Sequence, residues 1–451
     1  MMPVRLKQLT LAAVISLFWS TSSMAKQKCE SEVAANLKPV KEDSGFSWAV
    51  ELTGQLGYLG NNALDRTLAN GMAFMGLHYR TDLSSPHQFY FEGGYKDWYK
   101  SDDGPGVGGT GETWGSFPTP AKDHWGMREA YYDFNRNDTQ ITTGLHAASL
   151  GESLLLDERA IGGSLGRSFG SYSLNVTAGS VMTQFARMKD FCATRHVYRV
   201  VRGGRVNEIG DAFGETNFVG GTLSWSPNQG SSIEVEELPG DDPAEEDTFG
   251  AFEDEEFSSL AESETRLVKR LGVILFNQFG SGFEQDRLFY GGIAEFALMR
   301  DFELQIEVVH QHVANERVIG YLIQGERDFT WRSGALTSFW MGYIGSAAID
   351  SGALFRPSFS NLFLGEVMRL DVVNMPLVFG RVSHRLPWKG KPSVGLFAVA
   401  QTSASRTEEY DFESEVNLSR RLRLYGVVGL MRSEALSETT MVGRVQFRYA
   451  F

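Results

Sequence analysis

Hydrophobic and polar residues alternate along much of this chain, and the alternation is strictest at its C-terminus. From Met441 to Phe451, large apolar side chains occupy alternate positions, and Arg444, Gln446 and Arg448 stand between them. A period of two is that of a β-strand, in which successive side chains point to opposite faces. The last segment therefore predicts a strand with one apolar face and one polar face.

The same period recurs from the N-terminal third of the chain onward. Alternating segments lie at 46–52, 88–95, 172–178, 302–308 and 409–418. Strands of about ten residues match a tilted crossing of a bilayer. In hydrocarbon such a sheet must close, because an open edge leaves backbone groups without partners. The pattern predicts an all-β chain that forms a transmembrane antiparallel β-barrel.

Connections between these segments are of two lengths. Short ones are expected at 135–138, 169–171, 227–230, 300–301 and 419–420, and long ones at 101–124, 183–216, 238–265 and 348–373. Short periplasmic turns and long extracellular loops are typical of outer-membrane barrels. Counts from the two termini disagree by one strand between residues 183 and 286. The expected total is about 18 strands, with about 16 or 20 as the alternatives.

The N-terminus carries the features of a secretory signal peptide. Arg5 and Lys7 precede an apolar run that ends at Trp19, and small residues at Ser23 and Ala25 suit a cleavage site. The apolar run is too short to span a bilayer as a helix. We expect a signal peptide at 1–25, a periplasmic segment at 26–45 and an outer-membrane barrel at 46–451 of a Gram-negative cell.

Composition narrows the class of partners. The net charge is −14, which makes nucleic acid a poor partner, since binding there needs a basic surface. Aromatic residues make up 12% of the chain and the mean hydropathy is −0.21, which suits alternating lipid-facing and water-facing positions. The expected partners are outer-membrane lipid and lipopolysaccharide, the barrel assembly machinery through the terminal Phe451, and periplasmic or surface proteins.

Cysteine and histidine usage offers few chemical sites. Cys29 and Cys192 could form a disulfide in the oxidising periplasm, and the sequence leaves the paired and free states equally open. His310 and His312 share a strand face and could bind a metal, but no third ligand supports them, so a polar strand end is favoured. The acidic stretch at 241–264 suits a solvated loop or loose calcium binding. No metal or cofactor is expected.

One string resembles a hydrolase motif. Gly162, Ser164 and Gly166 match the G-x-S-x-G spacing of a nucleophile elbow. The string lies within an alternating strand and lacks the strand-to-helix turn that exposes such a serine. No catalytic residue and no enzymatic activity are therefore expected.

Two stretches resemble the alginate-export family of outer-membrane proteins. The first stretch begins with Met127–Phe134, which contains that family's "REAY" strand, and continues through the segments 141–145, 151–157 and 161–165. The second stretch consists of 354–359, Gly365, the strand from 377, 410–416 and 422–430. The resemblance implies an 18-stranded monomeric barrel and either passive export of an anionic polysaccharide or a general porin function. The chain departs from the family where Gly144-Leu145-His146 replaces a "GRQ"-like strand end, so His146 stands where a basic residue is expected near the pore.

Polar faces of the last three strands give the candidate lumen residues. We expect Glu413 and Glu415 beside Arg423, and Arg423 opposite Arg448. These charged side chains would form a ladder along the lumen wall. The ladder could be a structural salt-bridge network or a selectivity element for the solute. The pore-lining candidates are Glu409, Asp411, Glu413, Glu415, Arg423, Arg444, Gln446 and Arg448.

Two functions follow from these features. The first is a passive outer-membrane channel for hydrophilic solutes, through export or diffusion of a polysaccharide or smaller saccharide. The alternative is a plugged structural barrel that anchors a larger cell-envelope complex through its loops at 183–216 and 238–265.

Overall fold

The computed structural model describes the wall of a β-barrel and parts of its connections. The described residues are 38–39, 45–61, 64–81, 85–100, 125–151, 154–181, 214–227, 267–281, 285–299, 302–350, 353, 355, 363–364, 370–371, 376–402, 407–419, 421–433 and 439–451. Within these ranges no helix is long and apolar enough to cross a membrane. The expected signal peptide, Cys29, Cys192 and the whole acidic stretch at 241–264 lie outside them.

Eighteen long strands form the wall, as the alternating pattern predicts. Their bounds are β2 (Phe46–Asn61), β3 (Leu64–Arg80), β4 (His87–Lys100), β5 (Trp125–Arg136), β6 (Thr139–Leu150), β7 (Leu156–Phe169), β8 (Tyr172–Ser180), β9 (Asn217–Trp225), β10 (Val268–Phe279), β11 (Arg287–Met299), β12 (Phe302–Val313), β13 (Glu316–Thr330), β14 (Leu336–Ala348), β17 (Leu377–Arg385), β18 (Ser393–Gln401), β19 (Thr407–Asn417), β20 (Leu422–Ser433) and β21 (Thr439–Ala450).

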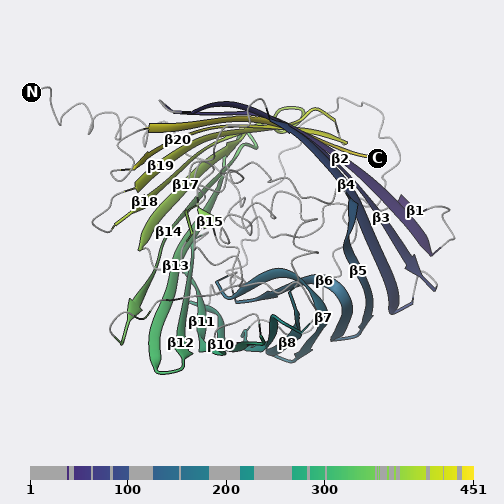
Figure 1. The fold of residues 1–451 in the computed structure, drawn as a ribbon, viewed down its shortest axis with the longest axis vertical. Coiled ribbons are helices and arrows are strands. Elements are labelled where there is room, and N and C mark those ends of the chain that lie inside the picture. The colour runs from purple at the N-terminus through teal and green to yellow at the C-terminus, as the bar shows by residue number, and fades with distance from the viewer. Residues whose placement is uncertain are drawn as a thin grey trace, which may run out of the picture.

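Each long strand pairs antiparallel with the next along the chain, and the last pairs with the first. The closing seam joins β21 to β2 from Glu51 opposite Ala450 to Gly60 opposite Met441. In Figure 1 the purple β2 accordingly lies beside the yellow end of the chain. The short β1 (Lys38–Pro39) adds to β2, while β15 (Phe363–Leu364) and β16 (Leu370–Asp371) form a separate pair. The predicted closed antiparallel barrel is confirmed.

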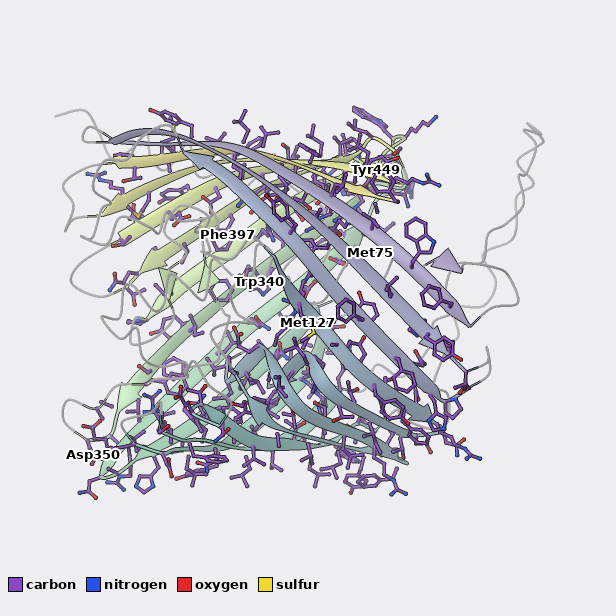
Figure 2. The ribbon with its side chains drawn as sticks, turned by 45° about the vertical axis from the view of Figure 1, so that its right-hand side comes forward. Met75, Met127, Trp340, Asp350, Phe397 and Tyr449 are labelled. Atoms are coloured by element: carbon purple, nitrogen blue, oxygen red, sulfur yellow. The ribbon has the colours of Figure 1, made fainter. Side chains whose placement is uncertain are left out.

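The outer face of the wall is apolar. On β19, Tyr410 and Phe412 are 48% and 50% exposed, whereas their neighbours Glu409 and Asp411 are fully buried on the inner face. Other exposed apolar side chains, such as Met75 of β3, continue this outer surface around the barrel (Figure 2). Large apolar side chains exposed on the outer face of most wall strands suit hydrocarbon rather than water.

Connections at the end that carries Phe451 are mostly short. The turns at 137–138, 170–171 and 300–301 lie at this end, and the longer connections 101–124, 181–216 and 349–376 lie at the opposite end. This arrangement follows the predicted asymmetry, with the Phe451 end in the periplasm.

One predicted connection is wrong. A turn at 227–230 followed by an extracellular loop at 238–265 requires a barrel strand between them. Instead β9 pairs directly with β10, with Trp225 opposite Leu271, so no place remains in the wall for that strand. A single connection from Ser226 to Leu267 therefore joins strand ends at the Phe451 end. Proline, asparagine and glycine at 227–230 suit a tight turn, but they equally begin a long connection.

Candidate functional site

The lumen is the candidate functional site, and its wall has two unlike halves. Inward positions of β19–β21 and β2–β5 carry acidic and basic side chains, whereas those of β9–β18 nearer the end opposite Phe451 carry buried aromatic and aliphatic ones. Trp340 of β14 packs on Phe379 of β17 at 4.4 Å and on Phe397 of β18 at 6.3 Å between ring centroids (Figure 2). The lumen is thus mainly charged on one side and mainly apolar on the other, where, among the described residues, Arg287 and Glu307 are the buried charged ones.

The candidate ladder occupies inward positions of β19, β20 and β21. Strand register places Arg423 opposite Arg448, and Nε of Arg423 lies 3.5 Å from Oε1 of Glu415. Glu413 does not pair with Arg423, contrary to expectation, and instead bonds Arg381 of β17. The reason is register, since Glu413 lies opposite Val427 and Arg423 opposite Asn417 on the neighbouring strand.

The remaining members of the ladder also have neighbours of complementary character. Nε of Arg448 lies 3.2 Å from Oε1 of Glu51 on β2, across the closing seam. The guanidinium of Arg444 lies 5.4 Å from the centre of the Tyr425 ring, within cation–π range. Gln446 is opposite Tyr425 in register, and Glu409 and Asp411 are buried on the inner face. Four successive inward positions of β19 are acidic, and four arginines lie on β17, β20 and β21 beside them, so the formal charges of this wall largely cancel.

The predicted ladder lacks Arg381 and Glu51 because they lie on β17 and β2, outside the last three strands. Glu51 stands at a polar position of the alternating segment 46–52, which was a usable signal. Both roles of the ladder, as a salt-bridge network and as a selectivity element, stay predictions.

A second charged cluster joins β3, β4 and β5. Nη1 of Arg128 lies 2.8 Å from Oε1 of Glu92, the Tyr90 hydroxyl donates to Oε2 of Glu92 at 2.6 Å, and the Arg128 guanidinium lies 4.5 Å above the Phe74 ring. The pair is fully buried, with side chains 1% and 0% exposed. The register of β4 and β5 skips Arg128, a bulge that lets Arg128 and Glu129 both turn inward. A strict period of two cannot reveal such a bulge.

The hairpin formed by β6 and β7 leaves the wall and enters the lumen. Pairing of β5 with β6 stops at Leu145, and pairing of β7 with β8 begins only at Ile161. Beyond these points β6 contacts β8 and β9, which are not its hydrogen-bonded neighbours, and Figure 1 draws its end inside the ring. We call residues 146–160 the inward hairpin.

Gly144 marks the point of departure of the inward hairpin. Its φ is +119°, and a Cβ there would lie 2.4 Å from the carbonyl oxygen of Ala130 on β5. Only glycine adopts this conformation at such a close approach. The strand end at Gly144-Leu145-His146 is therefore the place where β6 turns away from β5 and out of the wall.

The inward hairpin rests on the apolar half of the lumen. Leu154 and Leu155 at its tip are fully buried, and Leu150 lies against Gly220 of β9 beside Phe276 of β10. At Gly151 an added Cβ would come 2.4 Å from Oε1 of Glu307 on β12, so the tip reaches that strand. The hairpin thus crosses the inner face of β8 to β11.

A second inward segment comes from the connection after β14. Asp350 anchors it at the rim, where the Arg317 backbone N–H donates to Oδ2 at 2.8 Å and the Arg317 guanidinium contacts both carboxylate oxygens. Phe355 then packs edge-on to Phe289 of β11 at 6.2 Å and against Gly320 of β13. Both inward segments belong to one buried apolar cluster.

Arg159 of the inward hairpin connects it to the charged half of the wall. Its Nε donates to Oε1 of Glu129 on β5 at 2.9 Å, and both side chains are buried. The hairpin is therefore held by apolar packing on one face and by an ion pair on the other. Below it, on the side of Phe451, lies a cavity of about 860 Å³ against the inner wall of β3 to β8.

The hydrolase-like string lies in the middle of β7. The Ser164 hydroxyl lies 2.8 Å from Nε2 of His146 and 2.9 Å from the Thr177 hydroxyl. The strand around Ser164 pairs on both sides, with Thr142 of β6 and Thr177 of β8. An elbow needs a sharp strand-to-helix turn beside free backbone N–H donors, and this strand has neither feature at Ser164.

His310 and His312 lie on one face of β12, and Gln311 between them is buried on the opposite, inner face. His310 stacks on Tyr290 of β11 with ring centroids 5.3 Å apart. Among the described residues no three or more His, Cys, Asp or Glu side chains are placed to hold a metal ion.

The barrel is similar to solved structures of other bacterial proteins, although its sequence is not. No family model matches the chain, and no curated protein matches its sequence. Among solved structures, OccAB4 of Acinetobacter baumannii is similar with a TM-score of 0.51 and 9% identity, over 92% of this chain and 100% of that one. A BenF-like porin of Pseudomonas fluorescens Pf-5 is similar with a TM-score of 0.50 and 12% identity, over 90% and 98%.

These likenesses show a fold shared with outer-membrane porins along almost the whole length of both chains. At such low identity they show the fold alone. They support a porin-like barrel and do not support membership of the alginate-export family.

Proposed function

We propose, starting from a fold shared with outer-membrane porins, that this protein is a passive channel for hydrophilic solutes in a Gram-negative outer membrane. The observation that carries the proposal is the inner wall of a closed barrel whose charged side chains are arranged in opposite-sign pairs. A passive channel needs a polar lumen and a constriction, and it needs no catalytic group.

The balance of charge supports a neutral solute over an acidic polymer. Arg448, Arg423 and Arg381 each lie beside a glutamate, so no ring of uncompensated arginines faces the lumen at the ladder. Ion selectivity arises from rings of like charge, and paired charges weaken it. We therefore propose that sugar-like solutes diffuse through the channel. Export of a long polysaccharide is the narrower form of this proposal and rests on the family resemblance alone.

Conductance of the refolded barrel in a planar lipid bilayer tests the proposal. We expect open channels in potassium chloride with a reversal potential near zero under a salt gradient, because paired charges favour neither ion. Correctly folded protein that passes no current would contradict a channel. Strong anion selectivity would instead favour an exporter of acidic polymer.

A plugged structural barrel is the second candidate, favoured by one observation. The inward hairpin and Phe355 both occupy the lumen next to the apolar half of the wall. If these segments close the pore, the barrel would hold envelope proteins through its connections. A silent bilayer recording together with a stoichiometric partner after gentle extraction would support this role over that of a channel.

We also propose that Phe451 serves barrel assembly. Its backbone N–H donates to the Val50 carbonyl at 2.8 Å, and its ring packs edge-on to Tyr449 at the seam. An exposed terminal aromatic beside the closing seam suits recognition by assembly machinery, with lipid and lipopolysaccharide surrounding the finished barrel.

A further inference from the structure

The cavity below the inward hairpin has the size of a small-molecule site. Its volume is about 860 Å³, within the range of about 300–1,000 Å³ typical of such sites. The exposed face of the hairpin, with Ala147 and Ser149, forms one side, and inward positions of β3 to β8 form the other. The lining reaches the turn at Asn137 and Asp138, so the cavity lies on the Phe451 side of the inward hairpin.

Asp133 of β5 is the best-oriented polar group in the cavity. Its Oδ1 accepts hydrogen bonds from the Thr142 hydroxyl at 2.6 Å and from the Gln140 amide at 3.1 Å, both on β6. These two donors fix the plane of the carboxylate. Among the described residues no side chain donates to Oδ2, which leaves one oriented acceptor for a solute.

An aromatic surface lies beside this carboxylate. Tyr131 is two residues before Asp133 on the same inner face, and its ring lies 5.2 Å from that of Tyr90 on β4, tilted by 40°. The hydrogen bond from Tyr90 to Glu92 holds the Tyr90 ring in place. Aromatic faces bury the apolar C–H surface of a bound ligand, and nearby polar groups then set its orientation.

The mixture of hydrogen-bonding groups in the wall distinguishes between solute classes. Amides such as Gln88, imidazoles such as His78 and hydroxyls such as Ser168 both donate and accept, and they stand alongside the Asp133 acceptor. A carboxylate solute would require donors alone, and an ammonium solute would require acceptors alone. A hydroxyl group donates and accepts, so a hydroxyl-rich solute fits this wall. The other charged residues of the lining offset one another, because Glu129 is paired with Arg159 and the lining contains both Asp138 and Arg167.

We propose that this cavity binds a neutral oligosaccharide, with Asp133 accepting from sugar hydroxyls and Tyr131 packing against a sugar ring. The proposal rests on the channel function and gives it a solute class and a binding site. It also gives the site a side of the membrane, since the cavity opens toward the Phe451 end.

Single-channel recording with maltotriose as the probe tests the proposal. We expect maltotriose to interrupt the potassium chloride current in a concentration-dependent way, more often when it is added from the Phe451 side. Asp133→Asn keeps the size of the side chain but removes the charge that strengthens the hydrogen bond. The variant should bind maltotriose more weakly, so the concentration that gives half block should rise about tenfold. An unchanged open-channel conductance would show that the barrel is intact.

The matched control is Glu303→Gln on β12, which makes the same change of charge at an inward position outside the cavity lining. It should leave the block by maltotriose unchanged. If maltotriose does not block the open channel, or if it blocks the Asp133→Asn channel as well as the wild-type channel, the binding site is overturned and the channel function stands. A block by spermidine but not by maltotriose would identify a cation site instead and overturn the proposal. A barrel without current would overturn the channel function itself.

Discussion

The buried ion pairs of this barrel lie in its lumen wall. Arg128 and Glu92 are removed from water, and so are Arg159 and Glu129, yet each charge faces an opposite charge at 2.8–2.9 Å. Removing two charges from water is costly, and their mutual attraction offsets this cost only while both partners are present. The stability of this part of the wall therefore depends on intact pairs.

Replacement of Arg128 by methionine should destabilise the barrel markedly. The change strands the buried Glu92 carboxylate, and losing one partner of a buried pair costs about 3–5 kcal/mol. Urea unfolding in lipid vesicles, followed by tryptophan fluorescence, should show a lower midpoint for the variant. The double variant Arg128→Met/Glu92→Gln should recover much of the loss, because no charge is then left alone. Equal midpoints for wild type and Arg128→Met would contradict the pairing.

At the residue scale, unbroken alternation is enough to predict which face of a strand a side chain occupies. The inward positions of Arg444, Gln446 and Arg448 follow directly from the period of two on β21. Partners on other strands did not follow, because the pairing of Glu413 with Arg381 depends on register between β17 and β19 across β18. Arg128 was beyond reach because a bulge breaks the period on β5.

The inward hairpin is the element that sets the geometry of the lumen. Its strands were expected in the wall, but only the N-terminal part of β6, up to Leu145, and the C-terminal part of β7, from Ile161, pair there with neighbouring strands. Propensity and alternation describe a strand but not the sheet that it joins. Only the contact of Leu150 with β9 and of Gly151 with β12 reveals the change of course.

A charge at the tip of the inward hairpin should widen the pore. Leu155→Asp places a carboxylate at a fully buried apolar position, and the cost of burying it should expel the tip from the wall. Barrel pairing does not involve Leu155, so the strands should stay closed and the single-channel conductance should rise. Leu155→Met keeps an apolar side chain of similar volume at the same position, so it serves as the control and should leave the conductance near the wild-type value. An unaltered conductance in Leu155→Asp would mean that this packing does not hold the constriction.

On the scale of the whole molecule, the number of strands and the closure of the barrel were predictable, but the topology of one connection was not. The chain from Ser226 to Leu267 joins β9 to β10 at the Phe451 end, although its length resembles that of an extracellular loop. Length alone does not assign a side of the membrane. The parity of the strands does, and parity requires every strand to be counted correctly.

Epitope insertion tests this orientation in cells. A tag within the connection 226–267 should be inaccessible to antibody on intact cells, because it would lie on the periplasmic side with Phe451. The same tag within the connection 349–376 should be labelled on intact cells. Permeabilising the outer membrane should make both tags accessible, which controls for expression. Labelling of the first tag on intact cells would reverse the assignment of the two ends.

The seam between β2 and β21 also bears on how fast this barrel can form. It is the one strand pair in the wall whose members lie at opposite ends of the chain, with Glu51 opposite Ala450. Every other adjacent pair is joined by a connection that limits the search for its partner, whereas the entropy lost in closing a loop rises with the length of the loop. Folding rates fall as contacts become less local, so the meeting of the two chain ends should be the slow step of spontaneous refolding. Until they meet, two unpaired edges remain in contact with lipid, and an assembly factor that holds these edges together would shorten that exposure.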